Sequence, residues 1–444
     1  MKNIDIEKED IKRWYLDNFE RVEDRFNGFR NLPFHQTRRA AIARFSEYGF
    51  PTPRHEDWKY TNVAPILQQK FTLASAAVDV PDGLLQELQF DGLQENVVVL
   101  VNGRYSAALS NLTLDQKGVI ISSLAEAMVS HPEIVNPALG KYANFDEESF
   151  TALNTAFTSD GTVIYLPDNT QVQEPIHLIH LSDSRSERFV SHPRNLFLIG
   201  KNSQADIIET FAGVSEPHYF NNLVSEVVLA ENARLNHLKV QEEGRTAFHI
   251  SNVHVHQERC SVYSSVNIDL GGALVRNNLN VRLNGVGCAS YLFGFYMGSG
   301  TQHIDNHTFV DHALPHCFSN ELYKGILDEK AKGVFNGKIL VRPDAQKTNA
   351  LQSNKTLLLT DEASINAKPQ LEIFADDVKC THGATIGQLD DEALFYLRAR
   401  GIGKEMAGAM LRHAFIRDVL DNVKETSVRE KLDAKIMQRF TNGK

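Results

Sequence analysis

The chain has 444 residues, of which 42% are hydrophobic and 23% charged, and its formal net charge is −10. These values describe a globular protein long enough for two or three units. The acidic excess disfavours nonspecific binding to nucleic acid or anionic lipid, and no run approaches the roughly 18 apolar residues of a membrane span, so we expect neither partner.

The N-terminus, MKNIDIEKEDIKRWYL, mixes charges of both signs and lacks the apolar core of a signal peptide. The cysteines are well separated and form no CxxC pair, which suits free thiols in a reducing compartment. They are Cys260, Cys288, Cys317 and Cys380. We therefore expect a cytoplasmic protein.

Residues 1–155 are predicted to form a mostly helical N-terminal domain. Apolar residues recur at steps of three and four from Ile11 to Phe29, a spacing typical of an amphipathic helix. A second helix is expected to end at Gly49, and we interpret the Trp58 segment as a strap packed on another domain. The stretch from Ile120 to Met128 is also expected to be helical.

From residue 156 to 387 the sequence changes to short alternating runs such as IHLIHL, NLFLIG and VSEVVL, punctuated by Asn, Asp and Gly. Alternation with a period of two predicts an all-β core. A sandwich, a barrel and a β-solenoid remain open, because no repeat of fixed length is present.

The sharpest chemical signal is Cys380 and His382, within VKCTHG near the end of this β-rich region. Side chains two apart on a strand point to one face, with Cα atoms about 6.5–7 Å apart. A thiolate and an imidazole could then reach one iron or sulfide. The alternative is a small buried thiol beside an unrelated histidine, since a lone Cys-x-His is a weak metal signal.

Residues 388–444 are predicted to form a C-terminal helical domain. Asp390 can cap a first helix, which is expected to end at Gly401. Two further helices are indicated by apolar residues at steps of three and four.

A second group of candidate metal ligands is rich in histidine. His303 and His307 could share one face of a strand while His312 and His316 take the other, so we interpret this group as polar turns and subunit contacts. The full set is His303, His307, His312, His316 and Cys317, and the same ambiguity applies to His249, His254 and His256.

Several enzyme classes lack their motifs here, since the sequence has no phosphate-binding loop, nucleophile elbow or His-Glu-x-x-His site. Two alternatives stay open. A polysaccharide-active β-helix enzyme would need convergent carboxylates, for which Asp376-Asp377 and Asp390-Asp391 are available, but the members of each pair would face oppositely if extended. A metal-dependent oxidase would use the histidine-rich run.

The segment from His303 to Ile402, HIDNHTFVDHALPHCFSNELYKGILDEK…KPQLEIFADDVKCTHGATIGQLDDEALFYLRARGI, resembles the SufD family, the scaffold subunits of the SUF iron–sulfur cluster assembly system. Weaker similarity occurs at RHEDWKYTN and VLVNGRYSAALS. The Cys-rich segments associated with the sister subunit SufB are absent. The resemblance implies a mainly β fold, with a right-handed parallel β-helix core flanked by the two helical domains.

The resemblance also implies function. It implies a non-enzymatic scaffold that pairs with SufB through the β-helix and binds the ABC-type ATPase SufC through its C-terminal helices, with a role in iron acquisition. Cys380 and His382 match the family's Cys-x-His at the face that meets SufB, where we expect them to bind a transient iron–sulfur cluster.

The bend at Arg398, Arg400, Gly401 and Ile402 is the expected SufC contact, unless it only packs the tail onto the core. Reduced flavin is associated with the complex, although this sequence has no flavin fingerprint. No cofactor is expected to bind the isolated chain tightly, and self-pairing through the SufB-facing surface is compatible with a shared core.

Overall fold

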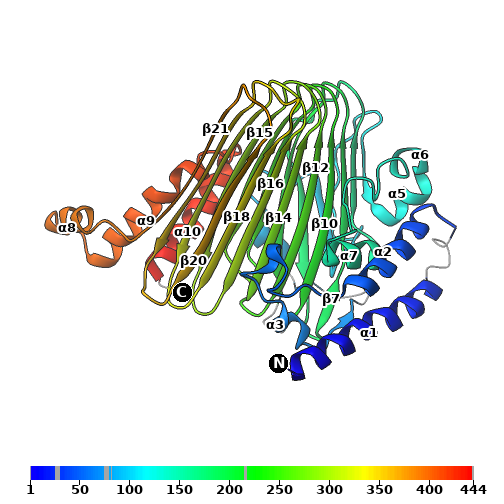
Figure 1. Cartoon of the computed structure of the whole chain (residues 1–444), viewed down its shortest axis with the longest axis horizontal. Coiled ribbons are helices and arrows are strands. Elements are labelled where there is room, and N and C mark those ends of the chain that lie inside the picture. Colours follow the sequence, from blue (N-terminus) through cyan, green and yellow to red (C-terminus); the bar gives the residue numbers. More distant parts are fainter. Residues whose placement is uncertain (1, 26–30, 75–79, 82, 215–217, 443–444) are drawn as a thin grey trace.

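The computed structural model describes residues 2–25, 31–74, 80–81, 83–214 and 218–442 (Figure 1). From β8 onward, consecutive strands alternate between two parallel sheets, so the chain winds as a β-solenoid with helices at both ends. The predicted fold class, a mainly β protein with a parallel β-helix core between N- and C-terminal helices, is confirmed.

The first sheet contains eleven strands. In spatial order they are β20 (Ser364–Ile373), β18 (Lys332–Val341), β16 (His303–His312), β14 (Leu274–Leu283), β12 (Phe248–Gln257), β10 (Phe220–Leu229), β8 (Arg194–Ile199), β5 (Thr162–Leu166) and β4 (Ile120–Ser123), with β1 (Thr72–Leu73) and β7 (Phe189–Ser191) paired beside them.

The second sheet contains ten strands. In spatial order they are β21 (Lys379–Gly387), β19 (Asn349–Leu358), β17 (Phe318–Leu327), β15 (Ala289–Gly298), β13 (Val262–Asp269), β11 (Arg234–Gln241), β9 (Gln204–Gly213), β6 (Ile176–Ser182), β2 (Val97–Val101) and β3 (Arg104–Tyr105).

The main core lies between the two sheets. Alternate residues point inward and stack in register from turn to turn, as Val227 does on Val255 and Val255 on Val281. Only every second side chain of a strand points into this core. The strands therefore read as alternating runs with few long apolar stretches.

Strands β1 to β4 lie within the segment expected to be mostly helical, and β4 occupies the start of the stretch from Ile120 to Met128 that is predicted to be a helix. The β-branched run of β2 pairs in parallel with β6, and β4 pairs antiparallel with β5. Ser123 ends β4 and caps the following helix, since its side chain accepts from the N–H of Glu126. The solenoid therefore begins earlier in the sequence than the alternating pattern indicated.

The N-terminal helices other than α4, which packs against β2 and β6 of the second sheet, cover the outer face of the first sheet (Figure 1). Aromatic residues of α1, α2 and α7 pack there against Phe220 and Phe248. Helix α1 begins well before Ile11, and Phe26 and Phe29 lie outside the described residues. The helices are α1 (Lys2–Arg25), α2 (Phe34–Tyr48), α3 (Ala64–Leu67), α4 (Leu84–Leu88), α5 (Leu124–Ser130), α6 (Pro132–Val135) and α7 (Ser149–Phe157), with a 3₁₀ turn at Glu56–Trp58.

A buried ion pair helps to fix this layer. Arg194 of β8 donates to Glu226 of β10 through Nη2 at 2.7 Å, and both side chains are fully buried. The Glu226 carboxylate also accepts the backbone N–H groups of Gly140 and Tyr142. A buried charge is tolerated when it is paired and hydrogen-bonded in this way.

Three C-terminal helices follow the last strand: α8 (Asp391–Ala399), α9 (Lys404–Leu420) and α10 (Thr426–Asn442). Helices α9 and α10 pack on the outer face of the second sheet, and Lys324 of β17 donates to the carbonyl of Phe415 at 2.6 Å and to Asp418 at 2.7 Å. Helix α8 buries none of its residues and projects from the body (Figure 1).

Candidate functional site at the last turn of the solenoid

The last turn of the solenoid is formed by β20 and β21, and β21 carries Cys380 and His382. Cys380 stacks in register on Ala350, and His382 stacks on Gln352, so both side chains lie on the inward face, as their spacing predicts. Cys380 is half-buried against the main core, whereas His382 is exposed. Burial raises the pKa of the Cys380 thiol.

Exposed apolar side chains surround this turn. Ile373, Phe374 and Ile386 are 40%, 63% and 54% exposed, whereas Val341 and Thr356, which lie in register one turn below Ile373 and Ile386, are buried. In the part of the chain that the structure describes, β20 and β21 each pair with a strand on one side only. A terminal strand with apolar neighbours is a template for pairing with another chain.

The turn beneath His382 contains buried polar groups. Gln352 of β19 donates through Nε2 to Glu321 Oε2 of β17 at 2.8 Å, and the two side chains are 3% and 1% exposed. Burial raises the pKa of Glu321 to about 7. No short motif joins residues so distant in the sequence, so only their register reveals the contact.

The histidine-rich run does not gather into one site. His303 and His307 lie on the outer face of β16, where His303 contacts Thr61 at 2.8 Å and His307 pairs with Asp305 at 3.0 Å. His312 points inward and contacts Ser319 at 2.9 Å. Among the described residues, no group of three or more His, Cys, Asp or Glu is arranged to hold a metal ion.

The other candidate histidines are also separated from one another. His249 pairs with Glu243 at 2.7 Å inside the solenoid, while His256 pairs with Glu258 at 2.8 Å on the outside. Cys288 and Cys317 are buried at one corner, and His316 has a φ of 60° in the turn just before Cys317. His254 is half-buried, and Cys260 is exposed.

The sequential carboxylates do not converge. Asp377 pairs with Lys347 across one turn, and the Asp390 side chain caps α8 by accepting from the N–H groups of Glu392 and Ala393. A structural contact thus accounts for one carboxylate of each pair that a polysaccharide-active enzyme would have used.

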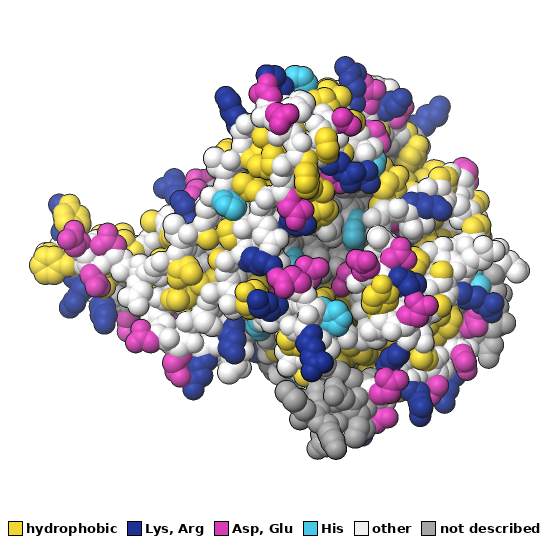
Figure 2. All heavy atoms as spheres, viewed as in Figure 1, with side chains coloured by type: hydrophobic (Ala, Val, Ile, Leu, Met, Phe, Trp, Pro, Cys, Tyr) yellow, Lys and Arg dark blue, Asp and Glu magenta, His cyan; other side chains and the backbone are white. Residues whose placement is uncertain are grey.

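The bend between α8 and α9 holds the second group of candidate residues. Arg398, Arg400 and Gly401 are exposed, Ile402 is half-buried, and Gly401 has a φ of 88°, which favours glycine. Phe395 is 73% exposed, and Figure 2 shows hydrophobic side chains at the tip of this projecting helix, among charged ones.

Sequence reasoning missed a polar pocket of about 680 Å³ between the Trp58 strap and the outer face of the first sheet. Trp58 is buried, as predicted, and the Arg276 guanidinium lies 3.8 Å above its ring. Arg276 also donates to the carbonyl of Asp57 at 2.8 Å. The strap therefore forms one wall of the pocket.

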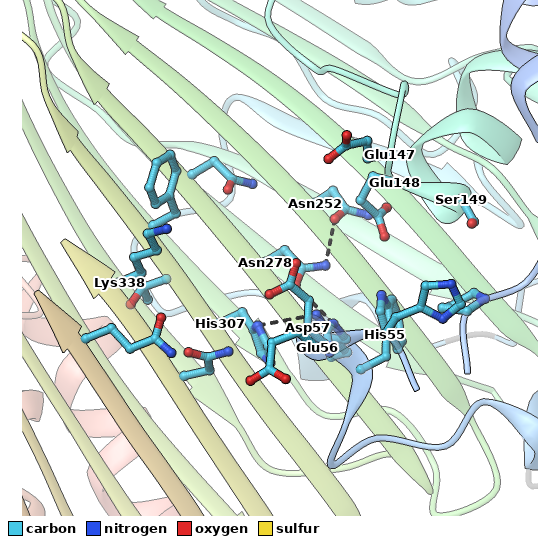
Figure 3. Close-up of a pocket in the computed structure, with 18 of the residues that line it drawn as sticks. His55, Glu56, Asp57, Glu147, Glu148, Ser149, Asn252, Asn278, His307 and Lys338 are labelled. Atoms are coloured by element: carbon cyan, nitrogen blue, oxygen red, sulfur yellow. Dashed lines mark hydrogen bonds between the residues drawn. The ribbon is translucent and has the colours of Figure 1, made fainter. Parts of the chain in front are cut away.

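Carboxylates and amides line this pocket. Figure 3 shows Asp57, Glu147 and Glu148 close to Asn252 and Asn278, whose side chains form a 2.7 Å hydrogen bond. Such a lining offers both donors and acceptors to a polar small molecule. Its signal in the sequence is the set of asparagines at outward positions of NVHVH and RNNLNV.

Comparison with known proteins identifies the family. Residues 180–415 match a family model described as "SUF system FeS cluster assembly, SufBD core domain", and residues 9–178 match the "SufBD protein N-terminal region". The chain belongs to the SufBD family.

Relatives similar to this chain have names of the same kind. The "Iron-sulfur cluster assembly SufBD family protein" of Synechocystis is 32% identical over 403 residues, which cover 89% of this chain and 88% of the relative. The "Iron-sulfur cluster assembly protein SufD" of Escherichia coli is 30% identical over 397 residues, covering 89% and 90%. "Protein ABCI7, chloroplastic" of Arabidopsis thaliana is 32% identical over 411 residues, covering 90% and 85%.

The SufBD core match covers every candidate cluster and partner residue named above, including Cys380, His382 and the bend before α9. The Trp58 strap falls within the N-terminal match. No helix among the described residues combines the length and apolar character needed to cross a membrane.

Proposed function

We propose that this chain is a SufD-like, non-enzymatic scaffold subunit that works in the cytoplasm with SufB and SufC to assemble and transfer iron–sulfur clusters. The observation that carries the proposal is the placement of Cys380 and His382 together on the open last turn. The match to SufBD proteins along nearly the whole chain supports the same role.

In this proposal the exposed last turn receives SufB. The edges of β20 and β21, with Ile373, Phe374 and Ile386 beside them, would pair with the corresponding end of a related solenoid. Strand addition at an open edge supplies main-chain hydrogen bonds, and the apolar side chains add buried area.

Cys380 and His382 would then contribute ligands to a nascent cluster at the junction, including iron during its acquisition. Soft thiolate and imidazole are suitable ligands for iron. Stable clusters are normally held by four cysteine-type ligands, so two ligands from this chain leave the cluster dependent on SufB and transferable. The cluster is the cargo of the assembly, and any reduced flavin would belong to the complex.

Cluster reconstitution tests this assignment. The chain is co-expressed with SufB and SufC, and cluster content is measured by visible absorbance in wild type, His382→Ala and Cys380→Ala. We expect the variants to form the complex with at least about tenfold less cluster, because ligand loss weakens metal binding strongly.

The matched control is Thr381→Ala, on the same strand but on the outward face. Thr381 stacks on Leu351, and the Leu351 side chain is 38% exposed. It should retain normal cluster content. Normal cluster in both His382→Ala and Cys380→Ala would show that the two residues are structural.

A further inference from the structure

One inward-facing column of the second sheet is polar in each of its last three turns. Leu292 of β15 is followed in register by Glu321 of β17, Gln352 of β19 and His382 of β21. The first two polar groups are enclosed between the sheets, whereas His382 is exposed at the end. A buried carboxyl thus lies two turns below the imidazole.

The opposite sheet leaves room for the middle member of this column. A Cβ atom on Gly337 of β18 would lie 2.4 Å from Gln352 Nε2, closer than real Cβ atoms approach. Glycine at this position allows the Gln352 amide to lie between the sheets and to reach Glu321 Oε2 at 2.8 Å. The fold therefore accommodates this contact at a specific point.

The contact also sets the direction of the amide. The ionised Glu321 carboxylate can only accept hydrogen bonds. Gln352 therefore directs its NH₂ group toward Glu321 and its carbonyl oxygen away from it. Gln352 Oε1 is buried, and it has no hydrogen-bond partner among the residues that the structure describes. His382 is the next side chain in register on the same face, and neighbouring strands are only about 4.8 Å apart.

We propose that Glu321 and Gln352 are positioning residues for His382. Glu321 orients Gln352, and rotation of the exposed His382 side chain brings a ring N–H to Gln352 Oε1, which lacks a partner among the described residues. The accepted hydrogen bond selects one neutral tautomer and leaves the lone pair of the other ring nitrogen directed away, toward the cluster. Metal-binding histidines are commonly oriented by such a second hydrogen bond. The role in cluster binding rests on the proposed function, but the orientation is a property of this chain alone.

Nitrogen-15 NMR of histidine-labelled full-length chain without iron tests the proposal. A protonated and a bare ring nitrogen differ in chemical shift, so the spectrum at pH 8, where an ordinary histidine is neutral, gives the tautomer ratio. His382→Ala identifies the His382 signals. We expect Glu321→Gln and Gln352→Met each to change the His382 tautomer ratio about fivefold, the effect of one ordinary hydrogen bond.

Thr356→Val is the matched control. Thr356 is a buried polar residue on the same strand and the same inward face, but it stacks below Ile386 instead of His382. It should leave the tautomer ratio unchanged. The double variant Glu321→Gln/Gln352→Met should resemble Gln352→Met alone, because Glu321 acts through the amide.

The outcomes separate this inference from the proposed function. The thermal unfolding midpoint of each variant shows whether it is folded. If the tautomer ratio is unchanged in both Glu321→Gln and Gln352→Met, the positioning role is overturned even if His382 proves essential for the cluster. If one variant fails to fold, the other decides. An altered ratio, combined with normal cluster in His382→Ala, would support the positioning role and reject the cluster role.

Discussion

At the residue scale, Glu321 links stability to pH. Burial raises its pKa to about 7, while the hydrogen bond from Gln352 acts in the opposite direction. The unfolded carboxyl keeps its ordinary value of 4.5. Between these two values the folded chain retains a proton that the unfolded chain has lost, so the contribution of this group to stability falls as pH rises.

Glu321→Gln should therefore become more stable relative to wild type as pH increases. The gap between the two pKa values corresponds to about 3 kcal/mol in the free energy of unfolding, an upper bound because the unfolded carboxyl is already mostly ionised at pH 5. Thermal unfolding of both proteins at pH 5 and pH 8 measures the change. Glu362→Gln, at an exposed position, should show no such trend, and a constant difference between Glu321→Gln and wild type would contradict the prediction.

At the element scale, α8 differs from the helices that follow it. Helices α9 and α10 bury apolar residues such as Ile416, Val419 and Leu432 against the second sheet, but α8 buries none. A projecting helix with exposed Phe395 and Tyr396 costs little stability to alter and is typical of a partner-binding element.

Variants at the bend should therefore affect partner binding without unfolding the chain. Arg400→Glu and Ile402→Ala should lower the amount of SufC that co-purifies by at least about tenfold, the effect of losing one important interface residue. The thermal unfolding midpoint should change little. Arg417→Glu, on the exposed face of α9, is the control, and undiminished SufC binding by both bend variants would disprove the contact.

At the scale of the whole molecule, the sequence predicted the strands better than their arrangement in space. Alternating runs correctly indicated strands, but the solenoid followed from the family resemblance. The inward residues Tyr263, Ser290, Ser319, Ala350 and Cys380 stack in register at unequal spacings, because the turns between strands differ in length. Unequal turns explain why no fixed repeat was found.

The same physical reason separates the parts of the site that could be predicted from those that could not. Cys380 and His382 are two residues apart, so strand geometry alone places them on one face. The contact between Glu321 and Gln352 depends on register between turns. The pocket is formed between the first sheet and the Trp58 strap, which is far away in the sequence. The sequence therefore shows the outward asparagines of the sheet but not the strap residues that face them.

The open end of the solenoid should also determine how the whole molecule associates. Phe374 and Ile386 lie exposed at the last turn, so in isolation two copies can cover each other's end through the surface proposed for SufB. Phe374→Asp and Ile386→Asp would place a charge in that contact, where an unpaired buried carboxylate is strongly unfavourable. We expect the double variant to be monomeric at concentrations at which wild type dimerises, and to lose co-purification of SufB by at least about tenfold.

Val129→Asp, at a 65% exposed position on α5, controls for the added charge. Sedimentation of the isolated chains measures the first effect, and a double variant that dimerises and binds SufB as wild type does would place the interface elsewhere.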